Sequence, residues 1–277
     1  MADLPKLGFT DITGEARLVG EYLRFRGDVM AERASHQAAA NWRPVLLIPG
    51  FLASDATLYP LGARLRSLGH RVHYSGIWMN ADCPAKTLDR LQKRVRSMHA
   101  VTGRKLVLIG HSLGGVYARE LARRDPGLVE RAVLLGAPVK HVMDNATPYL
   151  RPFIAAMRFM HMRCMESVGS PCPVCGLDIP EAAPDVPETV IYTKSDGVVA
   201  WHSCLDEGPM VECIEVESSH CGIPLNLKTW EVIANRLSTA LPHVRHQAER
   251  VEAKQRHTRR TRPGYLRLIA GGSRHSA

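Results

Sequence analysis

Residues 105–115 read Lys-Leu-Val-Leu-Ile-Gly-His-Ser-Leu-Gly-Gly, and this segment is the strongest indication of the fold class. An apolar strand pattern runs to Ile109, and a helix pattern follows the serine. Between them, Ser112 stands in a Gly-x-Ser-x-Gly turn, with Gly110 and Gly114 on its two sides. Small residues are needed there because a side chain would strike the adjacent strand or helix. The pattern favours a reactive serine on a sharp turn over the alternative that Ser112 merely caps a helix.

Strand and helix patterns alternate on both sides of this turn. Short apolar runs rich in β-branched residues predict strands, and apolar residues at steps of three and four predict amphipathic helices between them. The alternation favours an α/β fold with a mostly parallel central sheet and helices on both of its faces. The expected strands are 43–48, 71–77, 105–109, 131–135, 189–193 and 211–216, and the expected helices are 55–68, 85–101, 113–124 and 225–241.

One long connection interrupts the alternation. Residues 139–187 separate two strands, whereas connections in compact domains usually run about 2 to 6 residues. We interpret this methionine-rich segment as a lid insertion with one helix at about 149–168. Flexible thioethers suit an acyl pocket, but the simpler interpretation, which we favour, is an ordinary amphipathic cap helix that borders the site. The predicted organisation is an N-terminal helical extension (1–42), an α/β domain that carries the insertion (43–242), and a basic, disordered tail (243–277).

The composition is that of a globular protein. Of the 277 residues, 45% are hydrophobic and 23% are charged, which suffices for a sizeable core and argues against disorder. No run approaches the roughly 20 apolar residues that a membrane span requires. The N-terminal residues lack the basic start and apolar block of a secretory signal, so we expect a cytoplasmic protein.

The net charge of +9 is concentrated at the C-terminus. Residues 243–277 hold nine Lys or Arg against Glu249 and Glu252, which is +7, and the other 242 residues therefore carry +2. The body is not expected to bind nucleic acid specifically. We expect the tail to be solvated, with weak contact to anionic membranes as the alternative.

Seven cysteines suit a reducing compartment and do not form a dense disulfide framework. Cys172 and Cys175 have a Cys-x-x-Cys spacing, with a histidine and another cysteine upstream, which resembles half of a metal site. A local disulfide or free thiols explain this spacing equally well, so we predict no metal. Cys204 and Cys213 could pair if oxidised, although spacing alone does not show it.

A reactive serine needs a base, and the base needs an orienting carboxylate. After a Gly-x-Ser-x-Gly turn these follow the serine in the order Asp or Glu, then His. Asp196 follows the strand 189–193 and His220 follows the strand 211–216, so we expect both at the carboxyl edge of the sheet, where α/β proteins bind ligands. A solvated surface role is nevertheless the commoner one for any single Asp or His. The competing groups after the serine are Asp144, Asp178, Asp185, Asp206 and His202.

Acyl transfer also needs N–H donors for an oxyanion. The backbone N–H of Leu113, directly after the serine, is the first candidate because it lies at the positive end of a helix. The second candidate is the N–H of Phe51, which follows the strand 43–48, where Gly50 lets the backbone approach a ligand. The alternative for this second segment is a plain Pro-Gly turn that ends a strand.

Together these pieces resemble the α/β-hydrolase superfamily, and within it bacterial lipase-like serine esterases and GPI-inositol-deacylase-like hydrolases. The resemblance implies hydrolysis of carboxylic esters with no cofactor. It spans residues 45–241, about 70% of the chain. Pro49-Gly50 departs from the His-Gly of many relatives, and the two N-terminal strands common in the fold are not evident in residues 1–42. The matching pieces are 45–51, 110–115 (the nucleophile elbow, with His111), 195–199 and 218–222.

We therefore predict a serine esterase or lipase that acts on a small-molecule or lipid ester through an acyl-enzyme. Ser112 is the expected nucleophile, His220 the base and Asp196 the orienting acid. The same residues would serve an acyltransferase that passes the acyl group to an alcohol. A catalytically silent binding module of this fold is the alternative from another class. The substrate, the acyl-chain length and the oligomeric state stay open at this point.

Overall fold

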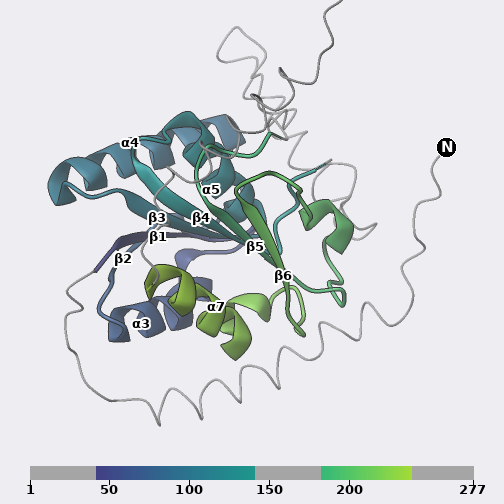
Figure 1. The fold of residues 1–277 in the computed structure, drawn as a ribbon. Helices are drawn as coiled ribbons and strands as arrows, with labels where there is room; N and C mark the ends of the chain where they lie inside the picture. The colour runs from purple at the N-terminus through teal and green to yellow at the C-terminus, as the bar shows by residue number, and fades with distance from the viewer. Residues whose placement is uncertain (1–41, 141–181, 239–277) are drawn as a thin grey trace, which may run out of the picture. The chain divides into compact units, whose positions relative to one another are not determined.

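A parallel six-stranded sheet forms the centre of the protein in the computed structural model, which describes residues 42–140 and 182–238 (Figure 1). The strand order is β2-β1-β3-β4-β5-β6, and every neighbouring pair is parallel. The fold class expected from the sequence is thus confirmed. The strands are β1 (Pro44–Ile48), β2 (Arg71–Tyr74), β3 (Leu106–His111), β4 (Val129–Leu135), β5 (Glu188–Tyr192) and β6 (Val211–Glu215).

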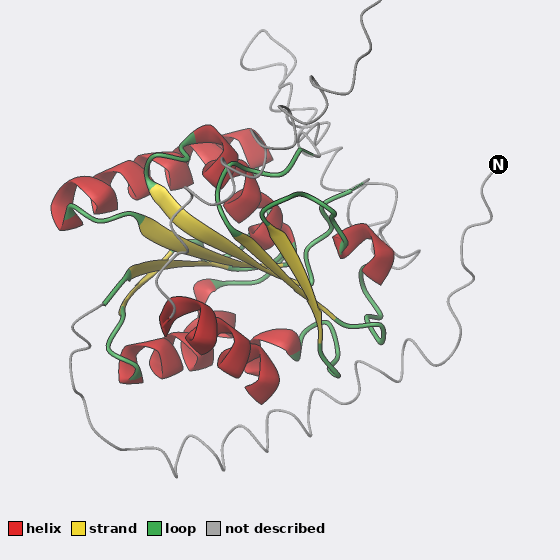
Figure 2. Ribbon diagram, viewed as in Figure 1, coloured by secondary structure: helices red, strands yellow, loops and turns green. Residues whose placement is uncertain are grey.

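Helices cover both faces of the sheet, with α4 and α5 on one face and α3 and α7 on the other (Figures 1 and 2). Among the described residues, three short 3₁₀ helices lie in the connections. The α-helices are α3 (Tyr59–Ser67), α4 (Pro84–Thr102), α5 (Leu113–Arg124) and α7 (Leu227–Ser238), and the 3₁₀ helices are η1 (Asp55–Leu58), η2 (Trp201–Cys204) and η3 (Ile223–Leu225).

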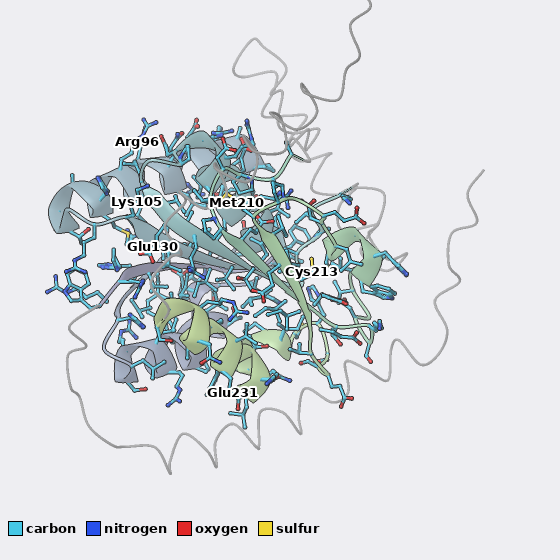
Figure 3. The ribbon with its side chains drawn as sticks, in the orientation of Figure 1. Arg96, Lys105, Glu130, Met210, Cys213 and Glu231 are labelled. Carbon is cyan, nitrogen blue, oxygen red and sulfur yellow. The ribbon has the colours of Figure 1, made fainter. Side chains whose placement is uncertain are left out.

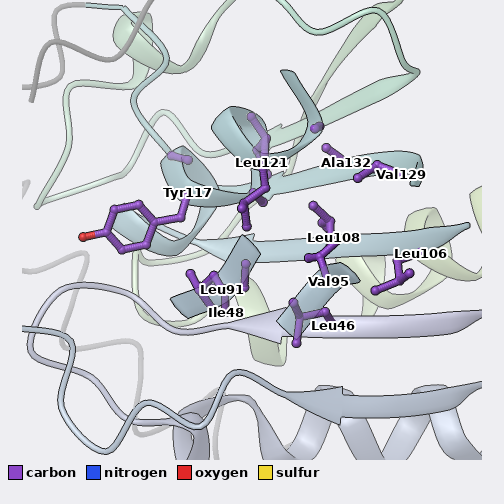
Figure 4. Packing of buried hydrophobic residues seen from close by; sticks show 14 of the residues in the cluster. Leu46, Ile48, Leu91, Val95, Leu106, Leu108, Tyr117, Leu121, Val129 and Ala132 are labelled. Carbon is purple, nitrogen blue, oxygen red and sulfur yellow. The ribbon is translucent and has the colours of Figure 1, made fainter. Parts of the chain in front are cut away.

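Alternate residues of the central strands pack against opposite helix layers, because successive side chains of a strand point to opposite faces. Leu46 and Leu108 join the cluster that contains residues of α4 and α5 (Figure 4). Leu47 and Ile109 join the cluster that contains residues of α3 and α7. All four side chains are fully buried, and burial of each contributes about 1.5–3 kcal/mol to folding. The alternation along each strand therefore supplies one apolar surface for each of the two helix layers.

Helix α4 shows how the local sequence sets these boundaries. It begins at Pro84, whose missing N–H costs nothing in the first turn. It ends at Thr102, and the next residue, Gly103, adopts a left-handed φ of 63° and donates its N–H to the His99 carbonyl at 2.8 Å. The stripe that includes Leu91 and Val95 is buried against the sheet.

The strand order reverses between β1 and β3. These strands are neighbours in the sheet, whereas β2 lies outside β1 and the later strands extend in the other direction. In open parallel sheets such a reversal leaves a crevice at the carboxyl ends of the two strands, and ligands bind there. The segment after β1 begins at Pro49, and the residue directly after β3 is Ser112.

Within the described residues, two expected elements differ from the structure by three or more residues at one end. The strand expected over 71–77 ends at Tyr74, because the N–H groups of Ser75 and Gly76 turn onto the Asp55 carboxylate at 3.2 and 2.7 Å. The helix expected over 55–68 begins as η1 and becomes α-helical only at Tyr59. Residues 1–41 of the N-terminal extension, residues 141–181 of the insertion and the tail expected at 243–277 lie outside the described residues.

Within residues 42–140 and 182–238, no helix combines the length and apolarity needed to span a bilayer. The same residues contain no group of three or more His, Cys, Asp or Glu that could hold a metal ion. Cys204 and Cys213 are free thiols, so the disulfide considered for them is not formed. Cys213 lies on β6, which pairs in parallel with β5 (Figure 3). Cys172 and Cys175 lie outside the described residues.

Candidate active site

Ser112 occupies a sharp turn between β3 and α5. Its φ of 52° and ψ of −123° are unusual for a residue with a side chain, and such strain gathers at functional sites. A Cβ on Gly110 would lie 2.1 Å from the Gly114 carbonyl oxygen, and one on Gly114 would lie 2.2 Å from the Ile48 carbonyl oxygen. Only glycine fits at these two positions, so the backbone crowding behind the serine explains the Gly-x-Ser-x-Gly pattern.

Asp196 and His220 form a buried pair at the carboxyl ends of β5 and β6. His220 Nδ1 lies 2.6 Å from Asp196 Oδ2. The other carboxylate oxygen accepts the backbone N–H groups of Val198 and Val199 at 2.8 and 2.7 Å. Because a carboxylate without a proton only accepts hydrogen bonds, Nδ1 of the neutral imidazole carries the proton and Nε2 is left to accept one.

Two further residues hold the pair in position. The Thr193 hydroxyl donates to the Ser218 carbonyl at 2.9 Å and so ties the segment before Asp196 to the segment before His220. Gly136 follows β4 with a left-handed φ of 57°, and a Cβ there would lie 3.2 Å from His220 Nδ1. The chain after β4 thus passes close to the imidazole, and the left-handed φ together with this close approach favours glycine at position 136.

His111 joins the serine turn to the His220 segment. Its Nε2 lies 3.0 Å from the His220 carbonyl oxygen, and since a carbonyl only accepts, Nε2 donates. The two rings lie 4.9 Å apart between centroids. Burial, together with the His220 imidazole, lowers the pKa of His111 to about 3. His111 therefore stays neutral near pH 7 and adds no positive charge beside His220.

The two expected oxyanion donors lie in segments next to Ser112. A Cβ on Gly50 would lie 3.1 Å from the Ser112 Cβ, so the backbone before Phe51 passes against the serine. Within the described residues the Phe51 N–H makes no hydrogen bond. Leu113 is the first residue of α5, where N–H groups have no intrahelical acceptor.

The competing aspartates and His202 either lie away from the Asp196–His220 pair or are outside the described residues. Asp206 forms an ion pair with the buried Arg119, and Asp185 is exposed before the amino end of β5. His202 stacks on Trp201 with ring centroids 3.5 Å apart. Asp144 and Asp178 are not among the described residues. The structure therefore brings Asp196, and none of these described alternatives, to His220.

Sequence reasoning missed Thr193 and Gly136. Thr193 directly follows β5 and Gly136 directly follows β4, at the edge of the sheet where Asp196 and His220 were sought. Searching every strand end for polar and glycine residues would have found both. Their roles depend on contacts with distant segments, so spacing alone does not identify their partners.

No protein-family model and no curated protein matches the sequence. Solved structures do resemble it. Lipase B of Aspergillus fumigatus is 16% identical with a TM-score of 0.52, over 74% of this chain and 54% of that chain. The mature lipase BlEst2 of Bacillus licheniformis is 14% identical with a TM-score of 0.54, over 74% of this chain and 96% of that one. A probable hydrolytic enzyme from Pseudomonas aeruginosa PAO1 is 14% identical with a TM-score of 0.51, over 75% of this chain and 88% of that one.

These similarities show that the protein has the α/β-hydrolase fold. The resemblance to that superfamily, inferred from the sequence, is confirmed at the level of the fold. The narrower likeness to GPI-inositol-deacylase-like hydrolases stays a prediction. At identities this low, the shared fold does not carry an activity from those proteins to this one.

Proposed function

We propose that the protein is a serine hydrolase that cleaves carboxylic esters, with Ser112 as nucleophile, His220 as general base and Asp196 as orienting acid. One observation carries the proposal. The buried Asp196–His220 pair, 2.6 Å apart, lies beside the strained turn of Ser112, and His111 joins the two through its hydrogen bond to the His220 carbonyl. The lipases among the similar structures support the reaction class.

The acylation half of the reaction begins at Ser112 Oγ. As Oγ attacks the ester carbonyl carbon, His220 Nε2 takes its proton, and the Asp196 carboxylate balances the imidazolium that forms. The negative charge moves to the carbonyl oxygen, which the N–H groups of Phe51 and Leu113 bind. The carbon–oxygen bond to the alcohol then breaks, and His220 returns the proton to the departing alcohol.

Deacylation repeats the same steps with water. His220 takes a proton from water as its oxygen attacks the acyl-enzyme carbonyl carbon, and the same two N–H groups bind the second oxyanion. The bond to Ser112 Oγ breaks and His220 returns the proton to it, which releases the carboxylic acid. No cofactor enters this scheme. The substrate is a small-molecule or lipid ester.

A fluorophosphonate probe tests the proposal, because it reacts with an activated serine. We expect mass spectrometry to find the label on Ser112 of the wild type. Ser112→Ala should lose the label and about 10⁶-fold of the turnover of p-nitrophenyl butyrate, with an unchanged thermal unfolding midpoint. Retention of more than a few per cent of turnover by this variant would overturn the assignment.

Two further results distinguish the alternatives. If an added alcohol diverts most of the acyl group from acid to a new ester, the protein is an acyltransferase that uses the same triad. If folded wild-type protein neither takes the label nor hydrolyses esters, the silent binding module replaces the enzyme.

A further inference from the structure

We infer that Asn80 is a positioning residue that clamps the turn from Gly50 to Ala53 and so aims the Phe51 N–H at the oxyanion. The inference rests on the proposed function, because it gives Asn80 a role only if an oxyanion forms beside Ser112. Asn80 itself does not touch the reacting atoms.

The turn that contains Phe51 has an unfavourable backbone. Ala53 donates its N–H to the Gly50 carbonyl at 3.1 Å, which closes a four-residue turn. Leu52, its third residue, has a left-handed φ of 56°, where glycine or asparagine is usual. A leucine keeps such a conformation only where the surrounding structure holds it. The turn therefore needs an external support.

Asn80 supplies that support through three hydrogen bonds. Its side-chain Nδ2 donates to the Pro49 carbonyl at 2.8 Å. Its backbone N–H donates to the Ala53 carbonyl at 2.9 Å, and its carbonyl accepts the Leu52 N–H at 3.0 Å. Asn80 is only 1% exposed, so water does not compete for these bonds. The clamp holds both flanks of the turn and the strained residue within it.

The Pro49 carbonyl is the point where this clamp meets the serine turn. A Cβ on Gly114, in the first turn of α5, would lie 2.5 Å from the Pro49 oxygen. The oxygen that receives the Asn80 amide is therefore packed against the helix end that offers the Leu113 N–H. The side-chain amide of Asn80 thus fixes the spacing between the segments of both proposed oxyanion donors.

Two substitutions test this role on the full chain. Asn80→Asp replaces the donating amide by an acceptor of the same shape, and Asn80→Ala removes it without adding charge. Both keep the two backbone hydrogen bonds. We expect kcat for p-nitrophenyl butyrate to fall about 10- to 100-fold, because a donor displaced by about 1 Å loses much of its effect, with KM changed less than threefold. Affinity for a trifluoromethyl ketone, whose serine adduct carries an oxyanion, should fall by a similar factor.

Gln92→Glu is the matched control. Gln92 also uses its amide as a donor, to the Asp125 carboxylate at 2.7 Å, but it lies on α4 away from the turn. It should lower the thermal unfolding midpoint while leaving kcat and ketone affinity unchanged. If Asn80→Asp fails to fold, Asn80→Ala carries the test.

The possible results separate this inference from the proposed function. Absence of the fluorophosphonate label on wild-type Ser112 removes the proposed function itself. If the wild type is labelled and hydrolyses esters while both Asn80 variants keep kcat within threefold, the clamp is overturned. A fall in kcat with unchanged ketone affinity, or an equal fall in Gln92→Glu, also overturns it, because a merely structural role would act in that way.

Discussion

Strand β5 has a buried carboxylate near each end, and the two are held by different kinds of group. Asp196, beyond the carboxyl end, is bonded through both oxygens to N–H groups of nearby segments: Val198 and Val199 on one oxygen and His220 on the other. The Val198 and Val199 donors are backbone amides and carry no charge. The carboxylate is therefore fixed in orientation, as a group that must hold one imidazole tautomer requires.

Glu188, the first residue of β5, is paired with a cation instead. Arg119 of α5 donates to its Oε1 at 2.7 Å and also pairs with Asp206. The second oxygen of Glu188 has no hydrogen-bond partner within the described residues. Burial outweighs the attraction of Arg119 and raises the pKa of Glu188 to about 7. The Arg119 guanidinium lowers the pKa of Asp206 despite partial burial of that carboxyl.

The difference indicates separate roles for the two ends. At the amino end, one buried cation offsets two carboxylates and links α5 to the segments around β5 and β6. Such a pair adds little stability over apolar residues of the same volume, but losing one partner costs much. The carboxyl end is expected to govern chemistry, and the amino end to govern stability and its dependence on pH.

The largest expected effect is a difference in activity between variants at the two ends of β5. Asp196→Asn should lower kcat/KM for p-nitrophenyl butyrate about 10⁴-fold, because an amide no longer holds the tautomer that leaves Nε2 free. Glu188→Gln, the same change of carboxylate to amide on the same strand, should leave it within threefold. Comparable losses in both variants would refute the division of roles.

Arg119→Met tests the expected role of the amino end of β5 in stability. It leaves Glu188 and Asp206 without their shared cation, so we expect a loss of about 3 kcal/mol in the free energy of unfolding, measured in urea. Arg96→Met is the control, because Arg96 is 59% exposed and pairs with Asp125 at 3.1 Å. It should cost less than about 1 kcal/mol. Similar costs for the two variants would mean that the buried cluster contributes no more than a surface pair.

The pH dependence of stability should reside at the amino end. The pKa of Glu188 is raised from 4.5 to about 7 in the folded protein, so between these values the folded state binds more protons than the unfolded state. The free energy of unfolding should therefore fall as pH rises through this range, by on the order of 3 kcal/mol. Glu188→Gln should flatten that fall.

Urea midpoints at pH 5 and pH 8, for the wild type and Glu188→Gln, measure this effect. The difference between the two proteins removes the contributions of other titrating groups. Equal pH dependence in both proteins would show that Glu188 does not titrate in this range.

The fold and the positions of the candidate site residues were predictable because their signals are local. Ser112 sits in a strand–turn–helix pattern, and Asp196 and His220 follow strand ends in a known order. Asp206, in the loop between β5 and β6, was a competing carboxylate, and its pairing with Arg119, 87 positions away, accounts for it instead. The Glu188–Arg119 contact spans 69 positions. No spacing rule encodes such contacts, because they arise when α5 packs on the sheet.

The role of Asn80 was hidden for a related reason. The strand before it was expected to run to residue 77, whereas β2 ends at Tyr74 and the chain then turns onto Asp55. That turn directs residues 77–80 along the segment after β1, as the bond from the Asp55 N–H to the Ile77 carbonyl shows. The hydrogen-bond partners of Asn80 could not be inferred from the sequence, because they depend on this turn after β2.

The smallest expected effect concerns substrate selectivity at the carboxyl edge. Trp78 is 90% exposed and Met79 is 55% exposed, on the loop that Asn80 bonds to the turn beside Ser112. An exposed tryptophan there offers apolar surface to the chain of an ester. Trp78→Ala should lower kcat/KM for p-nitrophenyl decanoate about fivefold, which is equivalent to burial of roughly 40 Å² of apolar surface. It should leave kcat/KM for the acetate ester unchanged.

Val101→Ala is the control, because it changes an 84% exposed valine in the last turn of α4, and it should alter kcat/KM for neither ester. When Trp78→Ala is combined with Glu188→Gln, the free-energy changes of the two substitutions should add, because the two ends of β5 share no partner. Equal losses on decanoate and acetate would instead assign Trp78 to the fold of the turn and not to the binding of substrate.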